Sequence, residues 1–213
     1  MDPATRLPLF PLRTVLFPGG HLPLQIFEVR YLDMVQRAHR DGSPFGVVCL
    51  TEGEEVRRGA DGGFQTEAFH TVGTLARIEH FDRPQPGLLS IRCSGQQRFR
   101  LARFECLPHG LWVGDAETLP DDPVVPIPSD LEHTALALER VVADLKAQDV
   151  PEADMPVQPP WRLDDCGWVA NRWCDLLPLS NGLRQQLLVV DSPLVRLELV
   201  ADALERYRLP PGG

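Results

Sequence analysis

Lysine is almost absent from this chain of 213 residues: lysine and arginine together number 21, and Lys146 is the only lysine. The phosphate loop GxxxxGK[ST] of many ATPases and the Ser-Lys pair of some proteases each need a lysine at a fixed place. Lys146 lies in an amphipathic helical pattern, away from any serine motif. The sequence also contains no GxSxG elbow and no HExxH motif. We therefore predict no catalytic residues and no enzymatic activity.

Five irregularly spaced cysteines form neither a CxxC motif nor a tight Cys/His cluster. This spacing indicates no zinc site, no disulfide framework and no cofactor. Cys49 and Cys93 lie in apolar segments, where cysteine packs as a small hydrophobe. The histidines nearest Cys93 and Cys106 in the sequence are His70, His80 and His109. A catalytic Cys/His pair among them stays open as a minor alternative.

Long apolar runs are missing as well, since no segment approaches the ~20 residues that a membrane span needs. The N-terminus lacks the basic and apolar regions of a secretory signal, so we expect no membrane association and a cytoplasmic location. The net charge of −9 argues against nucleic acid as a partner. A local basic patch at Arg98, Arg100 and Arg103 stays open, although alternation favours a solvated strand face there.

The residues that are present suggest an α+β protein. Proline-containing apolar segments start the chain, and a helical pattern follows from Glu28 to Gly42. With the later alternating segments there are roughly seven short strands, which predict a mostly antiparallel β pseudo-barrel with one helix. The expected strands are 7–12, 21–27, 45–50, 72–81, 88–93, 98–106 and 112–119, with Ser94-Gly95-Gln96 breaking the pattern between the fifth and sixth.

A C-terminal helical bundle is expected after this barrel. Residues 120–128 are proline-rich and predict a stiff linker. Ser129 and Glu132 then form a capping-box pattern. Helical periods follow to about 145 and again over 165–177, 180–190 and 192–208. The predicted division is therefore 1–119 for the barrel, 120–128 for the linker and 129–213 for the bundle.

A set of short motifs follows one order along the chain: LPLFPL, LFPG, IFEVRY, FGVV, VGTLARI, QRFRL, LPLS and DSPLVRLE. Together they resemble the N-terminal substrate-binding domain of Lon-type ATP-dependent proteases. The resemblance implies a barrel related to PUA-like folds, without ATPase or protease chemistry in this domain. It also implies that the chain binds polypeptide.

Five residues are candidates for contact with a bound polypeptide. Phe64 and Phe69 are the large apolar residues of the glycine-rich segment 51–71, and they either pin that segment to the core or face a partner. Trp161 lies in a proline-rich loop and is either a recognition aromatic or a docking anchor. Glu28 and Arg30 belong to the family pattern FExRY, where the resemblance allows a contact role but a structural role is favoured.

The leading hypothesis is a binding module that recognises exposed or unfolded polypeptide segments, or a protein partner, by strand addition or apolar docking. RNA binding through the PUA-like barrel and a cryptic hydrolase are the alternatives. The sequence does not identify the client, nor whether the protein works with a separate protease. It leaves the oligomeric state open, a homodimer included.

Overall fold

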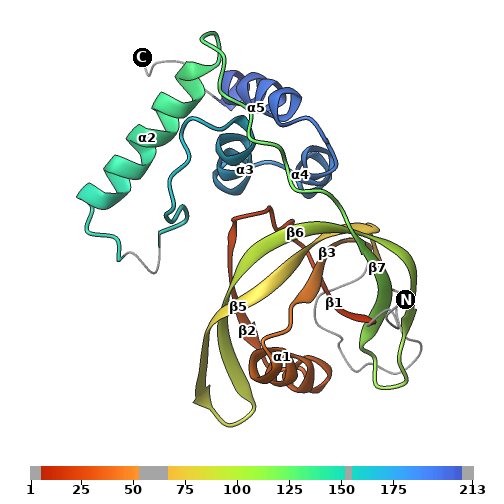
Figure 1. Ribbon diagram of the computed structural model, residues 1–213. Coiled ribbons are helices and arrows are strands. Elements are labelled where there is room, and N and C mark those ends of the chain that lie inside the picture. Colours follow the sequence, from red (N-terminus) through yellow and green to blue (C-terminus); the bar gives the residue numbers. More distant parts are fainter. Residues whose placement is uncertain (1–5, 53–66, 152–154, 208–213) are drawn as a thin grey trace. The chain divides into compact units, whose positions relative to one another are not determined.

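The N-terminal unit, residues 1–121, is built on a seven-stranded sheet with helix α1 packed against it (Figure 1). The computed structural model describes residues 6–52, 67–151 and 155–207. The elements of this unit are β1 (Leu7–Leu12), β2 (His21–Ile26), α1 (Val29–Asp41), β3 (Phe45–Glu52), β4 (Ala68–Phe69), β5 (Val72–Gln85), β6 (Leu88–Cys106) and β7 (Trp112–Thr118). The second unit, residues 122–213, is helical.

The sheet closes into a barrel because β1 has two partners. The strand order is β1-β7-β6-β5-β3-β4, and β1 also pairs in parallel with β3. Every other strand pairing is antiparallel, and β2 pairs with the first half of β6. The predicted α+β class and the mostly antiparallel barrel are confirmed.

Alternation along the strands separates two apolar clusters. Phe10 and Val47 are directly opposite in the β1–β3 register, and they belong to the larger cluster with Tyr31 and Val35 of α1. Their chain neighbours Leu9 and Val48 belong to the second cluster, together with Phe99 and Leu101. Because consecutive strand residues face opposite sides of a sheet, the two clusters lie on opposite faces.

Helix α1 ends at the glycine that closes the predicted helical pattern. Tyr31, Met34, Val35 and Ala38 are its buried apolar residues, and Leu32 is partly buried. Gly42 ends the helix at φ 63°, and its N–H donates to the Ala38 carbonyl. This left-handed position suits glycine because no Cβ is present to clash.

The predicted break at Ser94-Gly95-Gln96 is wrong, because β6 runs unbroken through it. Gly95 marks a close approach of another segment. Its N–H donates to the Gly20 carbonyl at 2.8 Å, and its carbonyl accepts from the Gly19 N–H at 2.7 Å. A Cβ on Gly95 would lie 2.1 Å from the Phe17 carbonyl oxygen, so only glycine leaves room for the turn to pack there.

The helical unit contains α2 (Glu132–Ala147), α3 (Cys166–Leu176), α4 (Asn181–Leu188) and α5 (Pro193–Tyr207). The Asp165 and Ser180 side chains accept from backbone N–H groups at the starts of α3 and α4. The predicted capping box at Ser129 is wrong: α2 begins at Glu132, and its N-cap Leu131 has no side-chain cap. A turn in which the Leu131 N–H donates to the Pro128 carbonyl precedes the helix and buries Leu131.

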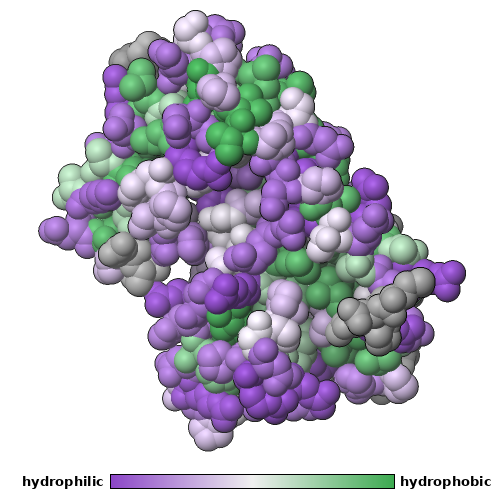
Figure 2. All heavy atoms as spheres, viewed as in Figure 1, coloured by the Kyte–Doolittle hydropathy of each residue, from purple (hydrophilic) through white to green (hydrophobic). Residues whose placement is uncertain are grey.

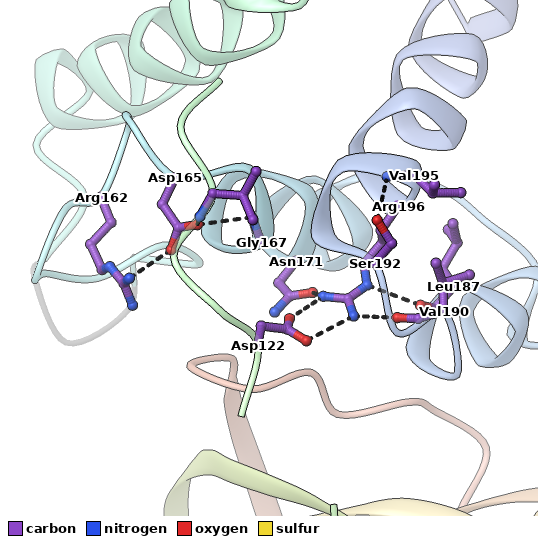
Figure 3. A network of polar contacts seen from close by, with 11 residues as sticks. Asp122, Arg162, Asp165, Gly167, Asn171, Leu187, Val190, Ser192, Val195 and Arg196 are labelled. Carbon is purple, nitrogen blue, oxygen red and sulfur yellow. Dashed lines mark hydrogen bonds and ion pairs between the residues drawn. The ribbon is translucent and has the colours of Figure 1, made fainter. Parts of the chain in front are cut away.

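Residues 122–126 pack along α3. The Cys166 N–H donates to the Val125 carbonyl at 2.9 Å, and Pro126 bridges to Asp165. Asp122 pairs with Arg196 of α5, which is buried (Figure 3). Because these contacts tie the proline-rich segment to the helices, it is held in place more firmly than a free spacer. The division of the chain at 119 and 129 stays a prediction.

Candidate functional site

At the start of α1, exposed apolar side chains alternate with charged side chains that are buried or partly buried. Glu28 is the N-cap residue, and Arg30 lies in the first turn of the helix. Arg30 is buried, whereas its neighbours Phe27 and Val29 are 54% and 77% exposed. Two apolar side chains are therefore held at the surface beside a buried cation.

Arg30 is held by an ion-pair network that reaches across the unit. Its Nε donates to Glu28 Oε2 at 3.0 Å, and Nη2 donates to Glu67 Oε1 at 3.0 Å. Nη1 donates to the Gly110 carbonyl at 3.0 Å. Burial alone would lower the pKa of Arg30, but the Glu67 hydrogen bond and the charges of Glu67 and Glu28 raise it. The guanidinium therefore stays cationic, and it fixes α1 to the segments that hold Glu67 and Gly110.

Glu67 links this network to three aromatic rings. The Trp112 Nε1–H donates to Glu67 Oε2 at 2.5 Å. The Trp112 ring contacts Phe69 edge-on with centroids 5.2 Å apart, and Phe104 with centroids 5.9 Å apart. Phe69 and Phe104 are themselves 5.0 Å apart. Phe104 is 45% exposed, so this cluster also offers apolar surface.

A groove of about 450 Å³ lies beside Arg30 and is mostly apolar in its lining. We call it the α1 groove. Its lining residues include Pro8, Val29, Met34, Pro44, His109 and Leu111. Arg30 itself belongs to the lining, and its partner Gly110 lies between His109 and Leu111. The groove, the ion-pair network and the aromatic rings therefore form one continuous region of the barrel unit.

The exposed edge of β5 is the other candidate for polypeptide contact in this unit. β5 pairs with β3 only over Thr74–Ala76, so Arg77–Gln85 lacks a second partner strand among the described residues. Bulges interrupt this stretch, and it carries Pro84 with several charges. The β5–β6 hairpin and α1 form the strongly polar lower end of this unit in Figure 2. Bulges, charges and proline are the features that keep strand edges from pairing.

Three of the five predicted site residues lie in this region. Glu28, Arg30 and Phe69 are connected through Glu67 and Trp112. Phe69 is half-buried by its ring contacts, and Glu28 and Arg30 have structural partners. Phe64 lies outside the described residues.

Trp161 belongs to the helical unit, where it is 36% exposed. The Lys146 Nζ lies 4.7 Å from the centre of its ring, and the Trp168 ring meets it edge-on at 6.3 Å. Trp161 therefore belongs to a surface of the helical unit and not to the barrel region.

Several residues of the region were missed from the sequence. Glu67 is 37 residues from Arg30, and no local pattern signals a pairing over that distance. Phe104 lies in a strand and Val29 in a helix, and the local pattern of neither element shows that its apolar side chain stays exposed. The FExRY pattern gave no signal for Val29, because the position between its two charged residues accepts any residue.

The basic patch left open at Arg98, Arg100 and Arg103 is not a uniform solvated face. Arg98 is buried, whereas Arg100 and Arg103 are exposed. A buried guanidinium does not reach phosphate groups in solution, so only Arg100 and Arg103 of this patch are available to a nucleic acid.

The described residues contain neither a metal-ligand cluster nor a cysteine with a lowered pKa. Within them, no group of three or more His, Cys, Asp or Glu residues is placed to hold a metal ion. No helix there combines the length and apolarity that crossing a bilayer requires.

Burial raises the pKa of the Cys93 and Cys174 thiols to about 12. Catalytic cysteines need the opposite shift, since the thiolate is the nucleophile.

We expect Cys106 alone to react quickly with a disulfide reagent such as DTNB in the folded protein at pH 8. Cys106 is exposed, and the other four cysteines are buried. The buried thiols should react at least ~100-fold more slowly because the reagent does not reach them in the folded protein. The measurement is the thiolate release rate with and without guanidinium. Cys106→Ser should remove the fast phase, and a second fast thiol in that variant would contradict the expectation.

Comparison with known proteins identifies the fold and its relatives. A sequence model of the ATP-dependent protease La (LON) substrate-binding domain matches residues 6–206. A Lon N-terminal domain protein from Xanthomonas campestris has 35% identity in its crystal structure, with a TM-score of 0.70, over 93% of this chain and 98% of that chain. The N-terminal domain of Mycobacterium avium complex Lon protease shares the fold at 18% identity, with a TM-score of 0.59, over 95% of this chain and all (100%) of that one.

Full-length relatives extend well beyond the matched region. The Lon protease of Anaeromyxobacter dehalogenans is 29% identical over 209 residues, which are 95% of this chain and 23% of that protein. Lon protease 2 of Myxococcus xanthus is 35% identical over 99 residues, 46% of this chain and 11% of that protein. The chain thus spans less than a quarter of the length of these Lon proteases.

Proposed function

Because this chain belongs to the family of substrate-binding domains of ATP-dependent protease La (Lon), we propose that it binds exposed apolar segments of unfolded polypeptide without chemically altering them. The α1 groove and the apolar side chains around it are the proposed contact surface. The observation that carries the proposal is the exposure of Phe27 and Val29 beside a rigid, buried Arg30. Large apolar side chains are costly to leave in water, and a partner that covers them recovers that free energy.

Of the two proposed modes of polypeptide binding, apolar docking in the α1 groove fits the structure better than strand addition to β5. The edge of β5 that lacks a second partner is bulged and charged, so an incoming strand would meet side chains that oppose pairing. The α1 groove instead offers Pro8, Met34 and Leu111 beside Val29. The Arg30 network holds these groups in place before the client arrives, so little ordering is needed upon binding.

The Asp33 and Arg37 side chains also line the groove. One carboxylate and one guanidinium at the rim suit clients of mixed charge, and neither sign dominates. A mixed rim is expected of a surface that recognises apolar residues in many sequence contexts. A cytoplasmic location, a protein partner such as a separate protease, and a homodimer stay predictions.

Replacing both Phe27 and Val29 by serine tests the contact surface. We expect the dissociation constant for a fluorescently labelled, reduced and alkylated client protein to rise about tenfold, the effect of losing roughly 1.4 kcal/mol of apolar contact. Fluorescence anisotropy measures the affinity, and circular dichroism checks that the fold is unchanged.

The matched control is the double variant Val124→Ser, Leu136→Ser, which removes two apolar side chains that are similarly exposed in the helical unit. It should bind the client as the unaltered protein does. Equal losses in both double variants would mean that binding follows general surface hydrophobicity, and the α1 groove would not be the site.

A further inference from the structure

The helical unit contains a second apolar pocket, of about 280 Å³. Its lining residues are Lys146, Val150, Met155, Val157, Pro159 and Trp161. Met155 and Val157 are buried and pack with Val142 of α2, so the floor of the pocket is part of the apolar core. Pockets for small-molecule ligands usually enclose about 300–1,000 Å³. A volume just below that range suits one large apolar side chain.

A single positive charge stands at this pocket. Lys146 is the only lysine of the chain, and its ammonium lies over the Trp161 ring at 4.7 Å. Among residues 6–52, 67–151 and 155–207, Lys146 has no carboxylate within ion-pair distance. The cation–π contact orients the ammonium at the pocket while leaving its N–H donors available.

The helix end beside Lys146 is closed by backbone hydrogen bonds. Lys146 is in the last turn of α2, where carbonyl groups point outward. The Gln148 N–H donates to the Asp144 and Leu145 carbonyls, and the Asp149 N–H donates to the Lys146 carbonyl. These bonds partly satisfy the last carbonyls of α2, and the Lys146 ammonium is the cation of this last turn.

We propose that this pocket binds the C-terminal residue of a client polypeptide. The last side chain, if it is apolar, enters the pocket between Trp161 and Met155, and the α-carboxylate pairs with the Lys146 ammonium. Only a chain end places a negative charge on the same residue as an apolar side chain. An internal segment brings an uncharged amide to that position, and it gains no ion pair from Lys146.

This inference rests on the proposed function and names a class of substrate for it: unfolded polypeptides with an apolar C-terminus. It adds a second contact surface to the α1 groove. The Trp161 side chain acquires a defined role as the wall of a side-chain pocket that also holds the cation in position.

The test compares two labelled ten-residue peptides that both end in leucine, one with a free C-terminal acid and the other with a C-terminal amide. Fluorescence anisotropy with the full chain should show about threefold to fivefold tighter binding of the acid, the scale of a partly exposed ion pair. Lys146→Met, which keeps most of the side-chain stem, should remove this difference. Arg140→Gln, which removes an exposed charge from the same helix, should preserve it.

Each outcome bears on the proposal. Equal binding of acid and amide, with affinity that still depends on Phe27 and Val29, would overturn the C-terminal pocket and leave the proposed function standing. If neither the peptides nor the unfolded client bind, both fail. A peptide acid that ends in serine should lose the advantage, and a serine-ended acid that binds as tightly as the leucine-ended one would show that charge alone is recognised.

Discussion

Replacing Arg196 by methionine is expected to lower the free energy of unfolding of the helical unit by about 3–5 kcal/mol, because the change leaves several inward-facing acceptors, among them the partly buried Asp122 carboxylate, without their donor. Arg196 is 1% exposed. Asp122 accepts from both terminal nitrogens of its guanidinium (Figure 3). Methionine fills a similar volume and offers none of these donors.

All the donors of the Arg196 guanidinium are used within the helical unit. Nη1 also donates to Asn171 Oδ1 at 3.0 Å, Nη2 to the Val190 carbonyl at 2.5 Å, and Nε to the Leu187 carbonyl at 3.1 Å. Two of these acceptors close the end of α4 and the turn into α5. One side chain thus joins the proline-rich segment, α3, α4 and α5, and a lysine there lacks enough donors in the right directions.

Urea unfolding followed by tryptophan fluorescence measures this effect, because Trp161, Trp168 and Trp173 all lie in the helical unit. Arg196→Lys should recover little of the lost stability. The control Arg206→Met alters an exposed arginine on the same helix and should change stability by less than about 0.5 kcal/mol. A small loss for Arg196→Met, comparable to the control, would mean that the buried network contributes no net stability.

Local features of the fold were predictable because their causes lie within a few residues. The expected helices begin at 165 and 180, where the Asp165 and Ser180 side chains cap α3 and α4, and the first helical pattern ends at Gly42, which is left-handed. The strand alternation likewise predicted a closed, mostly antiparallel sheet. Each of these signals is short-range, and the sequence displays it directly.

The features that escaped prediction join residues far apart in the chain. Gly95 looked like a strand break because its packing partner, the turn at Phe17–Gly20, is remote in sequence. Asp122 looked like part of a spacer because its partner Arg196 is 74 residues away. In the candidate site, Glu67 gave no signal for the same reason. Long-range polar pairs depend on the finished fold, so single-sequence patterns do not reveal them.

Replacing Arg30 by methionine is expected to destabilise the barrel unit by about 3–5 kcal/mol, because Glu67 would stay buried without its cation. The side chains of Arg30 and Glu67 are 5% and 3% exposed, and the structure gives them a shared role in fixing α1. The double variant Arg30→Met, Glu67→Gln should be more stable than the single Arg30 variant, because the more deeply buried of the two carboxylates that pair with Arg30 is then neutral, and Glu28 keeps some contact with water. The glutamine carbonyl still accepts from Trp112 Nε1. Thermal unfolding by circular dichroism gives the energies of this double-mutant cycle.

Client binding by the same double variant separates a structural role for Arg30 from a contact role. If Arg30 only positions α1, the folded double variant should bind the labelled client within about twofold of the unaltered protein, because Phe27 and Val29 remain exposed beside the groove. A folded double variant with at least tenfold weaker binding would show that the guanidinium touches the client directly. Single variants with unchanged stability would instead show that the ion pair contributes nothing to holding α1, and the rigid groove on which apolar docking depends would lose its physical basis.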